Sequence, residues 1–148
     1  MSKMRTNGKN DPPSFAETVI PLMKEYSSKL RSATRELRAS RERVRSIVES
    51  QVENTQDPQK TQTPKVQQFW HDRASALQTL DGQLCTPLQN LVPPARKLGQ
   101  HVSQMINHGG LADLEKIELS LRLAELESTI SVAQEMLQEH APVHLLFV

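Results

Sequence analysis

The sequence is poor in several residue types, and each deficit narrows the choice of fold. Aromatic residues make up only 3% of the 148 residues and glycine occurs five times, so a core must be built mainly from Leu, Val, Ile and Ala. Many Gln, Glu, Arg and Leu residues lie in apolar seams with spacings of three and four, which is typical of long helices. The composition therefore predicts an all-α fold.

Cysteine and long apolar runs are also scarce. The single cysteine, Cys85, excludes a disulfide framework within the chain and favours a reducing compartment. Residues 1–13 lack the apolar run of a signal peptide, and no window approaches the roughly 18 uninterrupted apolar residues of a membrane span. We therefore expect a soluble intracellular protein, cytoplasmic or nuclear, with no membrane span.

The sequence contains no recognisable catalytic or cofactor motif. Walker-type, G-x-G-x-x-G, G-x-S-x-G and H-E-x-x-H patterns are all absent. His101 and His108 share a helix face but lie about two turns, or roughly 10 Å, apart, which is too far for the pair to chelate one ion. We therefore expect no catalytic residue, no cofactor and no metal site, and hence a protein that is not an enzyme.

The segment 111–140 is predicted to be a helix with two apolar stripes. With 100° per residue, one stripe contains Leu114, Ile117, Leu121 and Ala124. The nearly opposite stripe contains Leu119, Leu123, Leu126, Ile130, Ala133 and Leu137. Because a helix that is apolar on two sides needs two covers, we expect it to lie between the other two helices, or between them and a partner helix.

Two further seams predict helices at about 14–54 and 65–107; the first seam includes Leu22 and Leu37, and the second includes Leu77 and Leu80. A capping box at Ser14 begins the first helix, and Pro21 either kinks this helix or moves its start to Thr18. The second seam keeps its phase through three prolines, so it is either one helix kinked there or several short helices laid end to end. These prolines are Pro87, Pro93 and Pro94. Gly109, which suits the left-handed conformation, is expected to end the second helix.

These elements predict an elongated antiparallel bundle of three long helices, spanning residues 14–140. Residues 1–13 are expected to form a disordered tail, and the polar segment 54–64 a linker. An apolar tail, 141–148, follows the bundle. Its residues Leu146, Phe147 and Val148 either fold back over the end of the bundle or are captured by a partner as an added strand.

Charge is distributed unevenly along the chain. Residues 1–53 contain 11 Lys and Arg against 7 Asp and Glu, whereas residues 109–148 contain 2 against 7. A basic face of the first helix is formed by Arg31, Arg35, Arg38 and Arg45. Such a row suits nucleic-acid phosphates, but acidic residues interrupt the segment and no aromatic residues are interleaved for base stacking. Packing against the acidic third helix is the other explanation of the row.

The sequence predicts a non-enzymatic interaction subunit, because thin bundles expose apolar seams. Such a scaffold, adaptor or escort would join other helical chains, in a homo- or hetero-oligomer, by coiled-coil packing. The candidate interface comprises Leu119, Leu123, Leu126, Ile130 and Leu137, together with Phe69 and Trp70. The two aromatic residues either plug the end of the core or anchor a partner. A nucleic-acid-associated protein that uses the basic face is the alternative.

Overall fold

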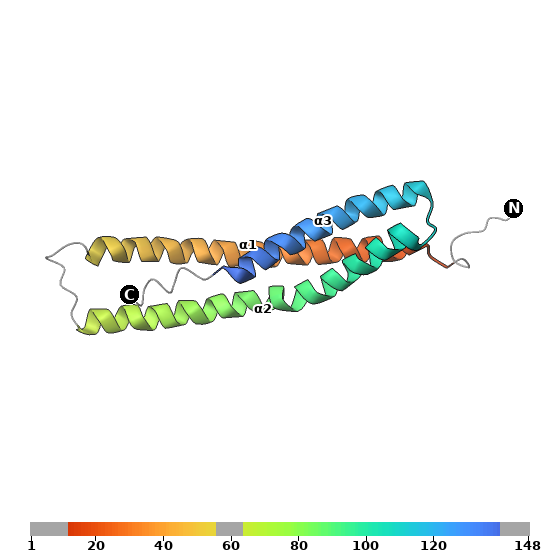
Figure 1. Cartoon of the computed structure of the whole chain (residues 1–148). Helices are drawn as coiled ribbons and strands as arrows, with labels where there is room; N and C mark the ends of the chain where they lie inside the picture. Colours follow the sequence, from red (N-terminus) through yellow and green to blue (C-terminus); the bar gives the residue numbers. More distant parts are fainter. Residues whose placement is uncertain (1–11, 56–63, 140–148) are drawn as a thin grey trace.

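The computed structural model describes residues 12–55 and 64–139. It contains three helices, α1 (Phe15–Thr55), α2 (Pro64–His108) and α3 (Asp113–Gln138), and each contacts the other two. α1 and α3 run in the same direction and α2 runs in the opposite one (Figure 1). The predicted all-α bundle of three long helices is confirmed, and the bounds differ from the expected ones by no more than two residues.

Several predicted segments lie largely outside the described residues. These are the N-terminal tail up to residue 11, the linker 56–63 and the apolar tail, including Leu146, Phe147 and Val148. The linker prediction was too long at both ends, because residues 54, 55 and 64 belong to helices.

α1 begins at a serine cap, as the capping box predicts. The backbone N–H of Glu17 donates to Ser14 Oγ at 3.1 Å, and the N–H of Thr18 donates to the Ser14 carbonyl oxygen at 3.1 Å. These bonds satisfy N–H groups of the first turn, which have no partner within the helix. A start at Thr18 is therefore wrong, and Pro21 lies inside the helix.

α2 is one helix through all three of its prolines, so the alternative of short helices laid end to end is wrong. Its ribbon bends near the middle (Figure 1). A proline deprives the carbonyl group four residues earlier of its N–H donor. The residues that carry these carbonyls are all exposed to solvent, namely Gln83, Gln89 and Asn90. Water can therefore replace the missing donors, while Leu88, Val92 and Ala95 remain buried on the core side.

The turn between α2 and α3 requires two glycines. Gly110, and not Gly109 as expected, has the positive φ, of 67°. Gly109 has no room for a side chain, because a Cβ atom there would lie 2.6 Å from the carbonyl oxygen of Met105. The N–H of Gly109 donates to that oxygen at 2.8 Å. At the end of α2 the backbone of Gly109 thus lies close to the carbonyl group of Met105. The chain changes direction at Gly110, where the positive φ favours glycine.

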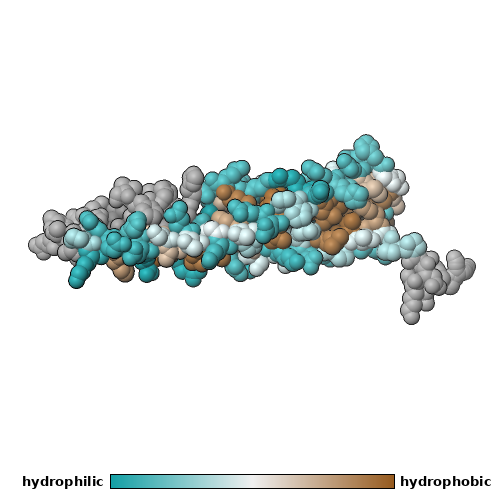
Figure 2. Space-filling view, turned by 90° about the horizontal axis from the view of Figure 1, so that it is seen from below, coloured by the Kyte–Doolittle hydropathy of each residue, from teal (hydrophilic) through white to brown (hydrophobic). Residues whose placement is uncertain are grey.

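The main core lies where all three helices run together. α3 contributes Leu119, Leu123, Leu126, Ile130, Ala133 and Met136, which are all buried. They pack with Met23, Leu30 and Leu37 of α1 and with Leu88, Ala95 and Val102 of α2. In the space-filling view, hydrophobic side chains reach the surface mainly over this half of the bundle (Figure 2).

A smaller core joins α1 and α2 beyond the end of α3. At 1.5 Å per residue, α1 is about 60 Å long and α3 about 40 Å, so α3 covers only part of the other two helices. Val44, Val48 and Ala74 are buried in the remaining part, with Trp70 and Leu77 packed against them.

Candidate partner-binding site

Both apolar stripes of α3 are present in the structure, but the other described residues cover only one of them. On the uncovered stripe, 82% of Leu114, 58% of Ile117 and 68% of Leu121 are exposed. Ala124 continues the stripe and is also exposed. These residues lie three or four positions apart, so their side chains adjoin along one side of the helix. We call the surface formed by Leu114, Ile117, Leu121 and Ala124 the outer stripe.

The residues predicted as the interface on the third helix lie in the core instead. Leu119, Leu123, Leu126 and Ile130 are buried against α1 and α2, and Leu137 is half-buried at the edge of the same cluster. A partner of the folded bundle would not reach the four buried side chains. Leu114, Ile117 and Leu121 are exposed, so the outer stripe is the apolar side of α3 that a partner could reach.

The two adjacent aromatic residues at the start of α2 have different environments. Their rings meet edge to face, with centroids 5.3 Å apart. Trp70 packs against the smaller core, as a plug at the end of the bundle would, whereas 55% of Phe69 is exposed. Phe69 is thus the member of the pair that projects into solvent.

A shallow groove adjoins the outer stripe at the N-terminal ends of α1 and α3. It has a volume of about 530 Å³. It is lined by Ser14, which precedes α1, by Ala16, Glu17, Ile20 and Pro21 of α1, and by Leu114, Glu115 and Glu118 of α3. Because three carboxylates line this groove, we call it the acidic groove.

Glu115, which lines the acidic groove, links the N-terminal ends of α1 and α3. Its Oε2 atom accepts a hydrogen bond of 3.1 Å from the backbone N–H of Ala16. This N–H is one of the donors at the start of α1 that have no partner within the helix, and a negative charge is favourable there. The carboxylate therefore serves α1 as a cap supplied by α3.

The basic face of α1 lies along a groove between α1 and α3. Arg31, Arg35 and Arg38 line this groove, which has a volume of about 360 Å³. Arg31 Nη2 lies 3.2 Å from Glu125 Oε2 of α3, and Arg45 pairs with Glu42 of its own helix at 3.0 Å. Across the described parts of the chain, Arg35 and Arg38 form no ion pair. The basic α1 and the acidic α3 therefore adjoin. Among the described residues, a single ion pair, between Arg31 and Glu125, joins the basic face to α3.

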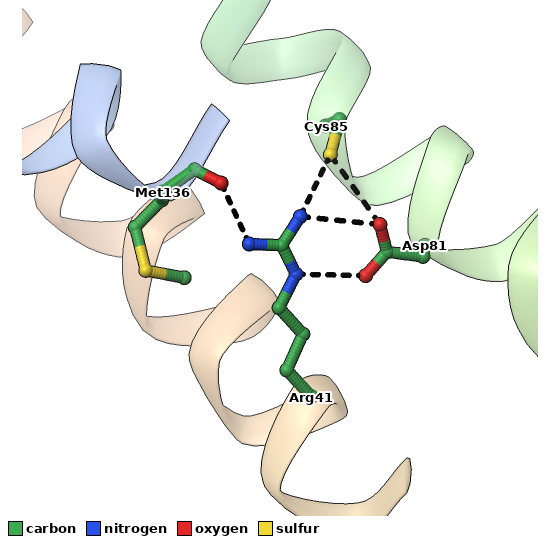
Figure 3. Close-up of polar contacts among 4 residues, drawn as sticks. All are labelled: Arg41, Asp81, Cys85 and Met136. Carbon is green, nitrogen blue, oxygen red and sulfur yellow. Dashed lines mark hydrogen bonds and ion pairs between the residues drawn. The ribbon is translucent and has the colours of Figure 1, made fainter. Parts of the chain in front are cut away.

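The most buried polar contacts surround Arg41, which the sequence analysis did not single out. Its Nε donates to Asp81 Oδ1 at 2.9 Å and its Nη2 to Asp81 Oδ2 at 3.2 Å. Its Nη1 donates to the carbonyl oxygen of Met136 at 2.6 Å. The guanidinium group thus lies between α2 and the end of α3, with Cys85 beside it (Figure 3). One side chain of α1 therefore bonds to both of the other helices.

The local electrostatics suit a structural contact rather than a reactive one. Burial lowers the pKa of Arg41, but the hydrogen bond and the charge of Asp81 outweigh it, so the pKa is raised overall. The guanidinium remains charged at the C-terminal end of α3, where a cation is favoured. Burial, followed by the charge of Asp81, raises the pKa of the Cys85 thiol. A thiol of this kind is a poor nucleophile near neutral pH.

The sequence contains a signal for this ion pair, but a weak one. Arg41 follows Leu37 of the first seam by one helical turn, and Asp81 follows Leu77 of the second seam by the same interval. Charged residues are almost never fully buried unless they are paired, so two of opposite sign beside the seams are compatible with a buried pair. The signal is weak because the apolar Leu80 fits the second seam better than its neighbour Asp81 does. In the structure, however, 41% of Leu80 is exposed.

The described residues offer no group of three His, Cys, Asp or Glu side chains that is placed to hold a metal ion. Within the same residues, none of the helices has the length and apolar character needed to cross a membrane. Comparison of the chain with protein-family models, with curated proteins and with solved structures found no match.

Proposed function

We propose that the protein is a non-enzymatic interaction subunit that binds a helix of another chain through the outer stripe. The observation that supports this is the exposure of three large apolar side chains, Leu114, Ile117 and Leu121, on adjoining turns of one helix. Single exposed leucines are common on protein surfaces, but contiguous apolar patches mark interaction sites. Complete burial of one such side chain contributes about 1.5–3 kcal/mol.

The spacing of the outer stripe fits helix recognition. Its residues lie at positions i, i+3 and i+7, which is the pattern by which one amphipathic helix packs on another. A partner helix lying on this side would place α3 between itself and the rest of the bundle. Such a subunit would act as a scaffold, adaptor or escort inside the cell, where Cys85 stays reduced.

The test compares Leu121→Asp with Leu80→Asp. Both positions are exposed leucines, but Leu80 lies on α2, away from the outer stripe. We expect both variants to keep the helical circular dichroism of the parent, because neither charge is buried. Affinity purification and quantitative mass spectrometry would then compare the proteins that each variant retains.

The proposal predicts a set of proteins that the parent and Leu80→Asp retain and that Leu121→Asp loses. The expected loss exceeds tenfold, because a charge placed in an apolar contact costs more than 1.4 kcal/mol. Identical sets from the two folded variants would contradict a binding role for the outer stripe.

Nucleic-acid binding is the second candidate function. The observation that favours it is the groove lined by Arg31, Arg35 and Arg38. Glu125 lies in the same groove and pairs with Arg31, so part of the positive charge is already neutralised. We therefore rank this function below helix binding.

A further inference from the structure

We propose that the acidic groove and the outer stripe together bind a basic amphipathic helix, one that carries lysine or arginine beside its apolar face. This inference rests on the proposed function and adds the chemistry of the partner. It depends on three features of the groove, which are its apolar floor, the sign of its charges and the backbone carbonyl that Pro21 leaves without a donor.

The floor of the acidic groove is apolar and continues into the outer stripe. Ala16, Ile20 and Pro21 form the α1 side, and Leu114 forms the α3 side. Leu114 is also the first residue of the outer stripe, so one apolar surface extends from the groove along α3. A partner helix can therefore place its leucines against both helices instead of against α3 alone.

Among the described residues, the charged groups that line the groove all have one sign. Glu17, Glu115 and Glu118 line it, and no described lysine or arginine does. Glu115 already accepts the N–H of Ala16, whereas Glu17 and Glu118 form no ion pair with any described residue. Two carboxylates therefore remain to pair with cations of a partner.

Pro21 adds a further acceptor at the same place. Because proline has no backbone N–H, the carbonyl oxygen of Glu17 lacks the donor that a helix normally supplies from four residues on. Glu17 and Pro21 both line the groove. A lysine or arginine side chain could donate to this oxygen as well as to the carboxylates, whereas an acidic side chain could not.

The charges argue against a second copy of this chain as the occupant. Packing two outer stripes against each other would bring α3 to α3, and residues 109–148 contain seven acidic residues against two basic ones. Like charges juxtaposed across an interface are unfavourable. A partner with basic residues on each side of its apolar face satisfies the same surface without this repulsion.

The experiment uses two synthetic helical peptides with identical leucine positions, spaced by three and four residues. One peptide carries lysines beside the leucines and the other carries glutamates, and binding of each to the full chain is followed by fluorescence anisotropy. We expect the lysine peptide to bind at least tenfold more tightly than the glutamate peptide. Its affinity should fall as salt is added, because exposed charge pairs are screened.

A charge-reversed chain, Glu17→Lys with Glu118→Lys, provides the decisive comparison. Each exposed pair contributes up to about 1 kcal/mol, or about fivefold, so we expect the variant to lose the preference for the lysine peptide or reverse it. Glu36→Lys with Glu49→Lys is the matched control. It makes the same change in net charge at exposed positions of α1 outside the groove, and should keep the preference.

The results separate this inference from the proposed function. Equal binding of both peptides, with loss of both in Leu121→Asp, would overturn the basic partner while leaving the outer stripe as a binding surface. Unchanged binding in Leu121→Asp would contradict the role of the outer stripe in binding.

Two outcomes would show that the groove does not select the partner. One is a preference for the lysine peptide that persists after charge reversal in the groove, and the other is loss of this preference in the control variant as well. Concentration-dependent sedimentation of the parent alone, abolished by Leu121→Asp, would indicate a second copy as the occupant and would also overturn the inference.

Discussion

Replacing Arg41 by methionine should destabilise the bundle more than the same replacement of any exposed arginine on α1. The change removes a cation that is 6% exposed, together with its hydrogen bonds to Asp81 and Met136. The carboxylate of Asp81 would then be buried without its charged partner, keeping only the weak thiol donor of Cys85, whose Sγ lies 3.7 Å from Asp81 Oδ2. The carbonyl of Met136 would lose a donor at the end of α3. The loss of one partner from a buried ion pair costs about 3–5 kcal/mol.

The free energy of unfolding of the double variant, Arg41→Met with Asp81→Leu, should be closer to that of the parent than the value for Arg41→Met is. It removes both charges, so no uncompensated charge remains, and apolar side chains of similar size occupy the space. The carbonyl of Met136 still lacks its donor, at a cost of about 1–3 kcal/mol. We therefore expect the free energy of unfolding of the double variant to lie within about 3 kcal/mol of that of the parent.

Urea denaturation followed by far-ultraviolet circular dichroism measures these differences. Arg43→Met is the control, because Arg43 is exposed on the same helix and its loss should change the free energy of unfolding by less than about 0.5 kcal/mol. A loss below 1 kcal/mol in Arg41→Met, or a double variant less stable than Arg41→Met, would refute the argument.

The remaining predictions concern Cys85 and the basic face. Because burial and Asp81 raise the pKa of Cys85, iodoacetamide at pH 8 should alkylate the folded chain far more slowly than the urea-unfolded chain, and equal rates would contradict this. The neutral thiol contributes its full stabilisation below the ordinary pKa of 9.0, and this is lost as the pH rises through the raised folded value. Changing Arg35, Arg38 and Arg45 together to Glu should leave the bundle folded. Salt-dependent binding of the parent to nucleic acid, with a logarithmic slope of about 0.9 per phosphate contact and lost in this variant, would favour the second candidate function.

The helices could be predicted from sequence because their signals are local. Ser14 caps the first turn of α1, the Gly109–Gly110 pair ends α2, and apolar residues at spacings of three and four fill the intervals. Each signal depends on residues within a turn or two of one another, so no knowledge of the partner helices is needed. For the same reason the bounds agree to within two residues.

The rotation of each helix about its axis could not be predicted, because it depends on the neighbouring helices. Spacings of three and four are compatible with either of two adjacent rows of side chains on a helix. Judged by polarity alone, Leu22 and Leu80 belong to the buried row. The structure buries the neighbouring Met23 and Asp81 instead. Asp81 is buried because Arg41 of another helix meets it, and no pattern within α2 shows that.

The choice between the two stripes of α3 follows from contacts that hold this helix in one rotation. Polar contacts join α1 to α3 at three positions along the bundle. They are Ala16 with Glu115, Arg31 with Glu125, and Arg41 with the carbonyl oxygen of Met136. Turning α3 by half a turn would bury the outer stripe, but it would break all three contacts and expose the leucines of the core. Contacts within the bundle therefore hold the outer stripe in its exposed position. A surface fixed in this way loses little conformational freedom on binding, which favours its use as a recognition site.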